Sequence, residues 1–136
     1  VTASGVAFGT YDPSLGTSDD STGSIVVTCT FTGPGGDNTA NYTVTLSTGT
    51  SGSFVPRKLA AGTSRLNYNL FRDAARTQVW GNASSGTTII TGSLKVGPGA
   101  GNRTRTATHV IYGRIPQQQD ADTGDYSDLI QVTLTF

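Results

Sequence analysis

The sequence contains no glutamate and no methionine, one cysteine and one histidine, and only 13% of its residues are charged. Strong helix formers are therefore largely missing, whereas threonine, serine and glycine are abundant, and this balance predicts an all-β protein. The sequence has nine basic residues and nine aspartates, so its formal net charge is zero, and no basic cluster is visible in it. Nucleic acid and anionic membrane surfaces are therefore not expected partners.

The length of 136 residues predicts a single domain over residues 1–136. The sequence has no run of about 18 apolar residues and no basic-apolar-small signal segment, so membrane insertion is not expected. The chain begins at Val1 rather than methionine, which suggests a processed or trimmed product, and the composition is typical of exported surface proteins.

Short alternating segments separated by turn residues predict about seven strands, the pattern of an immunoglobulin-like β-sandwich. Their strand centres are Val6–Phe8, Ile25–Phe31, Tyr42–Leu46, Leu66–Leu70, residues 87–96, residues 108–115 and residues 130–136. Residues 72–77 (RDAART) have modest helical character, and Asp73 is spaced to pair with Arg76.

The final segment poses a structural problem. Ile130, Val132, Leu134 and Phe136 share one face, and the last of them is an apolar residue that is expected to face inward. An apolar row beside unpaired backbone groups is a template for another strand. A missing neighbouring strand is therefore a reasonable expectation.

No residue combination predicts catalysis or a cofactor. His109 has no second histidine or nearby nucleophile pattern, so we expect it to be structural. Cys29 lies in a strand on the apolar face, which favours either a buried thiol or half of a disulfide with an upstream partner over a reactive thiolate.

The polar loops also lack the pattern of a metal or phosphate site. Residues 120–128 (DADTGDYSD) superficially resemble a calcium loop, but the required glycine and glutamate positions do not match, so no metal is predicted. Asp19 and Asp20 are expected in a polar turn. Residues 33–38 (GPGGDN) and 97–102 (GPGAGN) lack the ending of a phosphate loop and are expected to be turns.

Trp80 has two interpretations. Its size suits an anchor at one end of a sandwich core, which we expect. Alternatively, it belongs to a sugar-binding or surface-binding site with the loop at residues 120–125. That reading describes an adhesin or lectin-like binding module.

Four segments are distinctive when taken together, and in chain order they are GVAFGTYDP, GSIVVTCT, YNLFRDAARTQVWG and YGRIPQQQDADTGDYSDLIQVTLTF. Their combination resembles the spore coat U domain family, which includes subunits of archaic chaperone-usher pili of Gram-negative bacteria. The resemblance covers nearly the whole chain. It implies a sandwich that lacks its last strand, which a donor strand supplies in trans.

The resemblance implies an acceptor groove for that donor strand. The terminal row Ile130, Val132, Leu134 and Phe136 would border the groove, and Val6 and Phe8 would form the opposite wall. The implied partners are neighbouring subunits in a homopolymer, together with a periplasmic chaperone and an outer-membrane usher during assembly. Recognition of this kind is β-augmentation.

The resemblance also implies a disulfide between Cys29 and a cysteine just before the first strand, a partner that this chain does not contain. The chain is then either part of a longer subunit or a domain that accepts a strand and donates none, as a tip subunit would.

The sequence thus predicts a secreted, non-enzymatic pilus subunit that serves cell adhesion and biofilm formation at the cell surface. The alternatives are a binding module at a fibre tip, a self-contained secreted coat protein, and an enzyme such as a glycosidase, for which no acid-base pair is visible.

Overall fold

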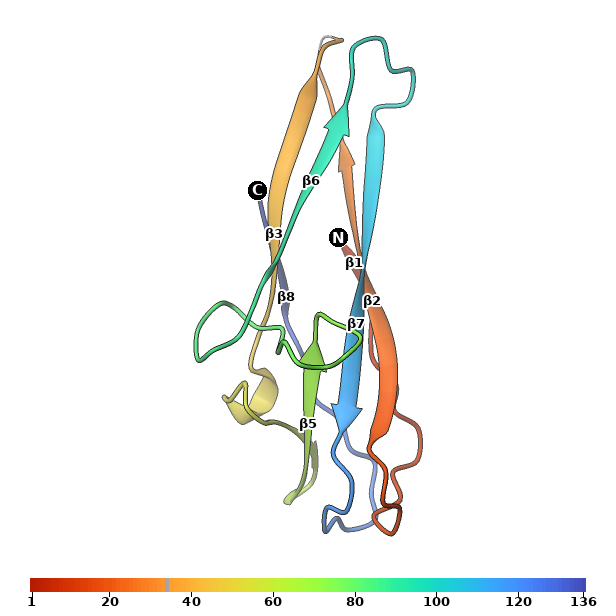
Figure 1. Ribbon diagram of the computed structural model, residues 1–136, viewed down its shortest axis with the longest axis vertical. Coiled ribbons are helices and arrows are strands. Elements are labelled where there is room, and N and C mark those ends of the chain that lie inside the picture. The colour runs from red at the N-terminus through yellow and green to blue at the C-terminus, as the bar shows by residue number, and fades with distance from the viewer. Residues whose placement is uncertain (34) are drawn as a thin grey trace.

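The computed structural model describes residues 1–33 and 35–136, which form eight β-strands and one short 3-10 helix (Figure 1). The elements in chain order are β1 (Thr2–Ser4), β2 (Asp19–Thr30), β3 (Asn38–Leu46), η1 (Gly49–Ser51), β4 (Arg57–Ala61), β5 (Ser64–Phe71), β6 (Ile90–Val96), β7 (Thr104–Ile115) and β8 (Val132–Thr135). The predicted all-β fold is confirmed.

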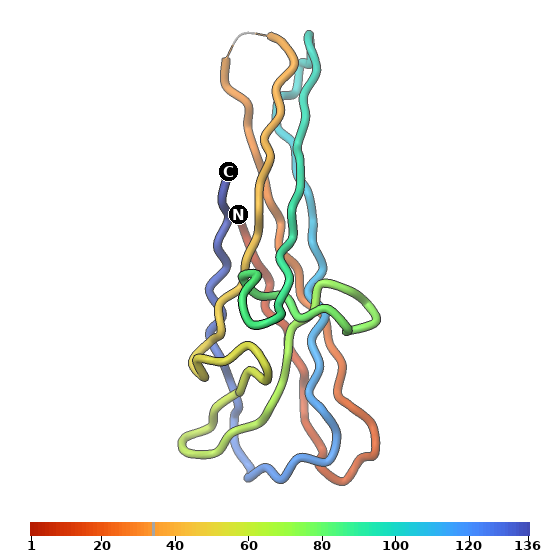
Figure 2. The backbone as a smooth tube through the Cα atoms, turned by 60° about the vertical axis from the view of Figure 1, so that its left-hand side comes forward, coloured from red at the N-terminus to blue at the C-terminus, as the bar shows by residue number. Residues whose placement is uncertain are grey.

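The strands form two antiparallel sheets that make an elongated sandwich (Figures 1 and 2). One sheet has the order β1-β2-β7-β5-β4, and the other has the order β6-β3-β8. The longest ladder joins β2 to β7 from Asp19↔Ile115 to Thr30↔Thr104. β1 and β8 are therefore edge strands of different sheets.

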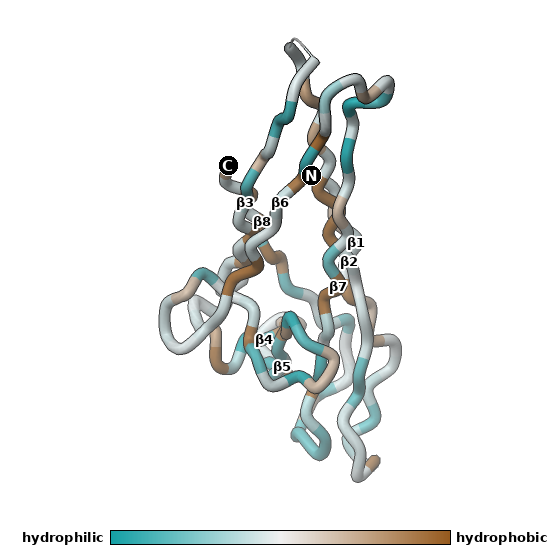
Figure 3. The backbone as a smooth tube through the Cα atoms, turned by 45° about the horizontal axis from the view of Figure 1, so that its top comes forward, coloured by the Kyte–Doolittle hydropathy of each residue, from teal (hydrophilic) through white to brown (hydrophobic). Residues whose placement is uncertain are grey.

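Apolar side chains from both sheets meet in one core, and the tube coloured by hydropathy shows apolar segments on β2, β3 and β7 (Figure 3). Alternation along each strand explains this arrangement, because every second side chain faces the opposite sheet. The core members are Ile25, Val27, Tyr42, Val44, Leu46, Leu59, Leu66, Tyr68, Leu70, Trp80, Leu94, Ile111 and Ile115.

Trp80 is fully buried at 0% exposure and donates its indole N–H to the Val44 carbonyl at 3.0 Å. The core interpretation of this residue is confirmed. A surface site that uses the Trp80 ring is wrong, since the ring is covered on all sides.

The segment at residues 72–77 forms turns rather than a helix. Asp73 accepts hydrogen bonds from the backbone N–H groups of Thr77 and Gln78, at 3.1 and 2.8 Å. The predicted ion pair with Arg76 does not form, because Arg76 turns away and lies 3.3 Å from Asp20 instead. Bonding of the aspartate to its own turn outcompetes the helical spacing.

One strand begins earlier than predicted, and another strand was not predicted. β2 begins at Asp19, so Asp19 and Asp20 lie in a ladder and not in a polar turn. β4 was not predicted, because its five residues carry a buried arginine where an apolar side chain was expected. In both cases the ladder tolerates polar residues that a hydrophobic pattern does not register.

The end segments also differ from the prediction, since the first strand is displaced toward the N-terminus and the last strand is shorter. β1 covers Thr2–Ser4, so Val6 and Phe8 follow the strand, and β8 begins at Val132 rather than Ile130. Both chain ends lie at about mid-height of the sandwich (Figures 1 and 2).

The two Gly-rich loops lie at the same end of the sandwich. The loop at 33–38 includes Pro34, which lies outside the described residues, and residues 97–102 form a turn and loop between β6 and β7. Within the part of the chain that the structure describes, no helix is long and apolar enough to cross a membrane.

Candidate functional site

The outer edge of β8 is the first component of the candidate site. Among the described residues β8 pairs only with β3, from Leu46↔Val132 to Thr43↔Thr135. The Ser47 N–H donates to the Gln131 carbonyl, so residues 131, 133 and 135 point their backbone groups toward β3. The N–H and C=O groups of Val132 and Leu134 therefore point to the open edge.

The apolar row on β8 is only partly covered. Ile130, Val132 and Leu134 are half-buried and pack against the core. The facing row of the neighbouring strand β3 is buried, since Val44 and Leu46 are 0% and 1% exposed. The apolar side chains of β8 are therefore less buried than those of β3, although the two strands carry the same kind of side chain.

Phe136 departs from the prediction that it faces inward. It lies at the end of the same row, but 69% of its surface is exposed. Its ring meets Tyr42 edge-on, with a centroid distance of 6.4 Å. One apolar neighbour leaves most of the ring in solvent, because no strand beyond β8 covers it within the described residues.

Val6 and Phe8 form the second partly covered row, on the segment that follows β1. Both are half-buried and pack over Gly113 of β7, where an added Cβ would lie 2.7 Å from either side chain. Phe8 also meets Tyr68 at a centroid distance of 6.1 Å. Ser21 holds the segment by donating its hydroxyl to the Ala7 carbonyl at 2.6 Å.

We refer to these two rows together as the acceptor face, after the role that the family resemblance implies, and define it by Val6, Phe8, Ile130, Val132, Leu134 and Phe136. The row Val6 and Phe8 packs over β7, the central strand of the five-stranded sheet, whereas the row from Ile130 to Phe136 runs along β8, an edge strand of the other sheet. A partly covered apolar row on an edge strand is a template for pairing with another strand.

A polar pair lies between the sheets near the end of the acceptor face. The Tyr42 hydroxyl and His109 Nε2 are 2.9 Å apart. Burial raises the pKa of Tyr42 and lowers the pKa of His109, which favours a neutral pair. Gly92 makes room for the tyrosine ring, since a Cβ there would lie 2.3 Å from it. The structural role predicted for His109 is consistent with this packing.

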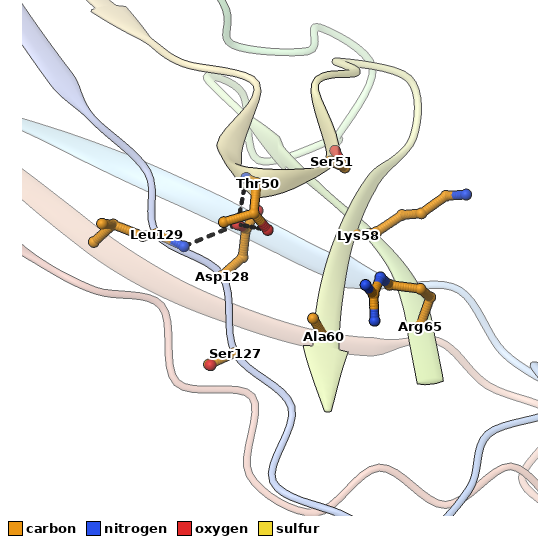
Figure 4. A pocket seen from close by; sticks show the side chains of 8 residues that line it. All are labelled: Thr50, Ser51, Lys58, Ala60, Arg65, Ser127, Asp128 and Leu129. Atoms are coloured by element: carbon orange, nitrogen blue, oxygen red, sulfur yellow. Dashed lines mark hydrogen bonds between the residues drawn. The ribbon is translucent and has the colours of Figure 1, made fainter. Parts of the chain in front are cut away.

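Asp128 fixes the segment that enters β8 (Figure 4). Its carboxylate accepts hydrogen bonds from the Tyr68 hydroxyl at 2.7 Å and from Thr50 N–H at 2.8 Å. Burial and the bond to Asp128 raise the pKa of Tyr68. Just before it, Ser127 pairs with Ala60 and caps the edge of β4. The open hollow beside this segment is lined by Thr50, Ser51, Lys58, Ala60, Arg65, Ser127, Asp128 and Leu129.

The loop at residues 120–128, which superficially resembles a calcium loop, does not gather its carboxylates. Asp122 accepts hydrogen bonds from the Ser64 hydroxyl, whereas Asp128 points toward Thr50 and Tyr68. Within residues 1–33 and 35–136, no group of three or more potential ligands could hold a metal ion.

Cys29 is half-buried on the core-facing side of β2 and forms no disulfide within the described chain. A half-buried position on this face suits a free thiol and also one half of a disulfide.

Sequence reasoning missed Arg57, which is 0% exposed. Its guanidinium donates to the Ser47 and Trp80 carbonyls and to Asn69 Oδ1, at 2.7 to 3.1 Å. The central carbon of the guanidinium also lies over the Phe54 ring, 5.1 Å from the ring centroid. Nothing in the sequence distinguishes this arginine from its exposed neighbour Lys58.

Comparison with known proteins gives the family. The Spore Coat Protein U domain matches residues 1–133 of this chain. Protein U of Myxococcus xanthus is 33% identical over 142 aligned residues, which cover 95% of this chain and 70% of that protein. These matches support a structural role at an extracellular surface. The chain belongs to the Spore Coat Protein U domain family.

Proposed function

We propose that this chain is a subunit of an extracellular chaperone-usher fibre and that its acceptor face receives a β-strand from a neighbouring subunit. The observation that carries the proposal is the half-buried row Ile130, Val132 and Leu134 beside the buried row of β3. The open N–H and C=O groups of β8 would pair with the donor, and alternate apolar donor side chains would cover the two rows.

The energetics favour such a strand. About four or five apolar donor side chains, each stabilising the complex by about 1.5–3 kcal/mol on burial, give a large gross gain before the cost of ordering the donor. A subunit could then leave the fibre only by exposing part of its core. Fibre stability would therefore be largely kinetic.

The proposal includes the assembly route and role that the family resemblance implies. A periplasmic chaperone would cover the acceptor face before an outer-membrane usher exchanges it for the donor. The fibre would serve adhesion and biofilm formation, without catalysis. Fully buried Trp80 offers no support for the rival binding module at a fibre tip.

The ladder between β1 and β2 bears on Cys29. Thr2 pairs with Val26, so the same register continued beyond Val1 would bring the second residue before Val1 opposite Cys29. A cysteine there would lie within the cross-strand distance that a disulfide requires. We therefore include a disulfide to the upstream segment in the proposal. Mass mapping of the protein expressed from its full coding sequence tests it.

The test of the main proposal is stabilisation by a donor. The isolated domain is mixed with a synthetic peptide of alternating apolar residues taken from the segment encoded before Val1. We expect the peptide to raise the melting temperature sharply, whereas a peptide with an aspartate at one of its inward positions should not.

A self-contained coat protein is the second candidate, and the coat-protein name of the matching family favours it. It predicts a domain that is a stable monomer and is indifferent to the peptide. That result would refute the fibre proposal.

A further inference from the structure

Positive charge gathers at one end of the sandwich. Residues 29–33, 35–39 and 94–106 form this end, which lies at the top of Figure 1. The only acidic residue in these segments is Asp37, and the three cations are Lys95, Arg103 and Arg105. Arg105 bridges the two sheets there by donating to the Lys95 carbonyl at 3.2 Å. We call these segments the basic end.

The opposite end is acidic. It contains residues 9–20, 61–65 and 114–126, at the bottom of Figure 1, and the Tyr11 hydroxyl joins two of these segments by donating to the Pro116 carbonyl at 3.0 Å. Two arginines accompany six aspartates: Arg65, Arg114, Asp12, Asp19, Asp20, Asp120, Asp122 and Asp125. We call these segments the acidic end.

Only part of this negative charge is compensated within the subunit. Asp20 pairs with Arg114 at 2.7 Å and with Arg76 at 3.3 Å. Asp120 and Asp125 are exposed and form no ion pair within the described residues. Lys95, at the other end, is likewise exposed and has no ion pair there. A neutral chain is thus divided into two ends of opposite charge.

Strand directions decide which ends meet in a fibre. All strand pairs among the described residues are antiparallel, and β8 runs toward the basic end. A donor strand antiparallel to β8 runs from the basic end of the acceptor subunit to its acidic end. The chain of the donor subunit therefore continues from the acceptor's acidic end. In its own subunit, a segment joined to Val1 in the register of β1 continues along β2 toward the basic end. The acceptor's acidic end therefore comes to lie beside the donor's basic end.

We propose that the basic end of each subunit docks on the acidic end of the next copy of this chain, so that electrostatic attraction orients subunits during assembly. The inference rests on the proposed function, because the donor strand sets which ends approach. Complementary charge at the rim of an interface mainly raises the association rate and makes it depend on salt.

Three variants of the protein expressed from its full coding sequence test the contact. Lys95→Asp reverses a charge at the basic end, and Asp120→Lys with Asp125→Lys reverses two at the acidic end. The side chains at 95, 120 and 125 form no hydrogen bond within the described structure, so the fold should persist, which melting curves would verify. Lys58→Asp is the matched control, because it makes the same change in charge at an exposed position on β4 that lies outside the segments of both ends.

We expect Lys95→Asp to slow polymer growth about 3- to 10-fold at low salt, and the control to change it less than about twofold. The difference should shrink at about 0.5 M salt. Mixing Lys95→Asp subunits with the acidic-end variant should restore the rate of polymer growth, because the reversed charges of the two variants are again opposite. In unchanged polymers, a carbodiimide should couple Lys95, but not Lys58, to aspartates of the neighbouring acidic end.

Normal growth of both charge-reversed variants, or coupling at Lys58 alone, would overturn the end-to-end contact and leave the proposed function standing. Failure of the unchanged protein to polymerise, with no stabilisation by the donor peptide, would remove the proposed function and this contact with it.

Discussion

Arg57 is a fully buried charge that joins three segments of the chain. Its partners Ser47, Asn69 and Trp80 lie before η1, on β5 and after the turn at residues 72–78. Arg57→Leu would leave the Ser47 and Trp80 carbonyl oxygens unpaired inside the core and Asn69 Oδ1 with the Leu70 N–H alone, so we expect a loss of about 3 kcal/mol or more in the free energy of unfolding. Urea unfolding measures it. The control Arg65→Leu should change stability by less than about 0.5 kcal/mol, since Arg65 is exposed. Equal losses would contradict the bridging role.

Gly113 is the residue on which one row of the acceptor face packs. Gly113→Ala would place a Cβ 2.7 Å from both Val6 and Phe8 and push their segment outward. We expect a loss of about 1–3 kcal/mol in stability and weaker binding of the donor peptide. Gly101→Ala is the control, because the space around that glycine is open. Donor binding equal to that of the unchanged domain would mean that the Val6 row does not contact the donor.

His109 gives the domain a pH-dependent stability. Burial lowers its folded-state pKa below the ordinary value of 6.5, so the unfolded chain binds more protons as the pH falls through this range. Stability should therefore be highest above that value and decrease from about pH 7.5 to about pH 5. His109→Gln keeps a partner for Tyr42 and should flatten this part of the profile. An unchanged slope in urea unfolding at the two pH values would show that other groups produce it.

At the scale of the element, β8 is expected to bind the donor strand through its half-buried face and its open backbone edge. Leu134→Asp places a charge among the half-buried side chains of the acceptor face, whereas Thr133→Asp places it on the exposed face. We expect Leu134→Asp to weaken donor binding at least about tenfold and to reduce domain stability less, because Leu134 is only half-buried. Calorimetric titration of the donor peptide measures this. Normal fibres or normal donor affinity from Leu134→Asp would refute the assignment of the face.

The alternation of apolar residues was sufficient to predict most strands, because a side chain facing the core repeats every second position. It failed where polar residues occupy a ladder. Asp19 and Asp20 extend β2 because their backbones pair with Ile115 and Arg114, irrespective of their side chains. The pattern also placed Phe136 on the correct face but not in the core, since coverage depends on a neighbouring strand.

The whole molecule has contacts that no local pattern reveals. The partners of Arg57 come from positions 47, 69 and 80, which only the fold brings together. The family was predictable because its segments occur in order along the chain, and the match over residues 1–133 confirms it. The acceptor face remains a prediction from that family and from the partial burial of two rows.

The central claim is that the open edge of β8 pairs with a strand from another molecule. Amide hydrogen exchange of the domain, resolved by residue with and without the donor peptide, tests it most directly. The N–H groups of Thr133 and Thr135 point to β3 and should be protected in both states. Those of Val132 and Leu134 should exchange quickly alone and become at least about 100-fold slower with the donor. Unchanged fast exchange at Val132 and Leu134 with the peptide bound, or protection of both without it, would contradict the account.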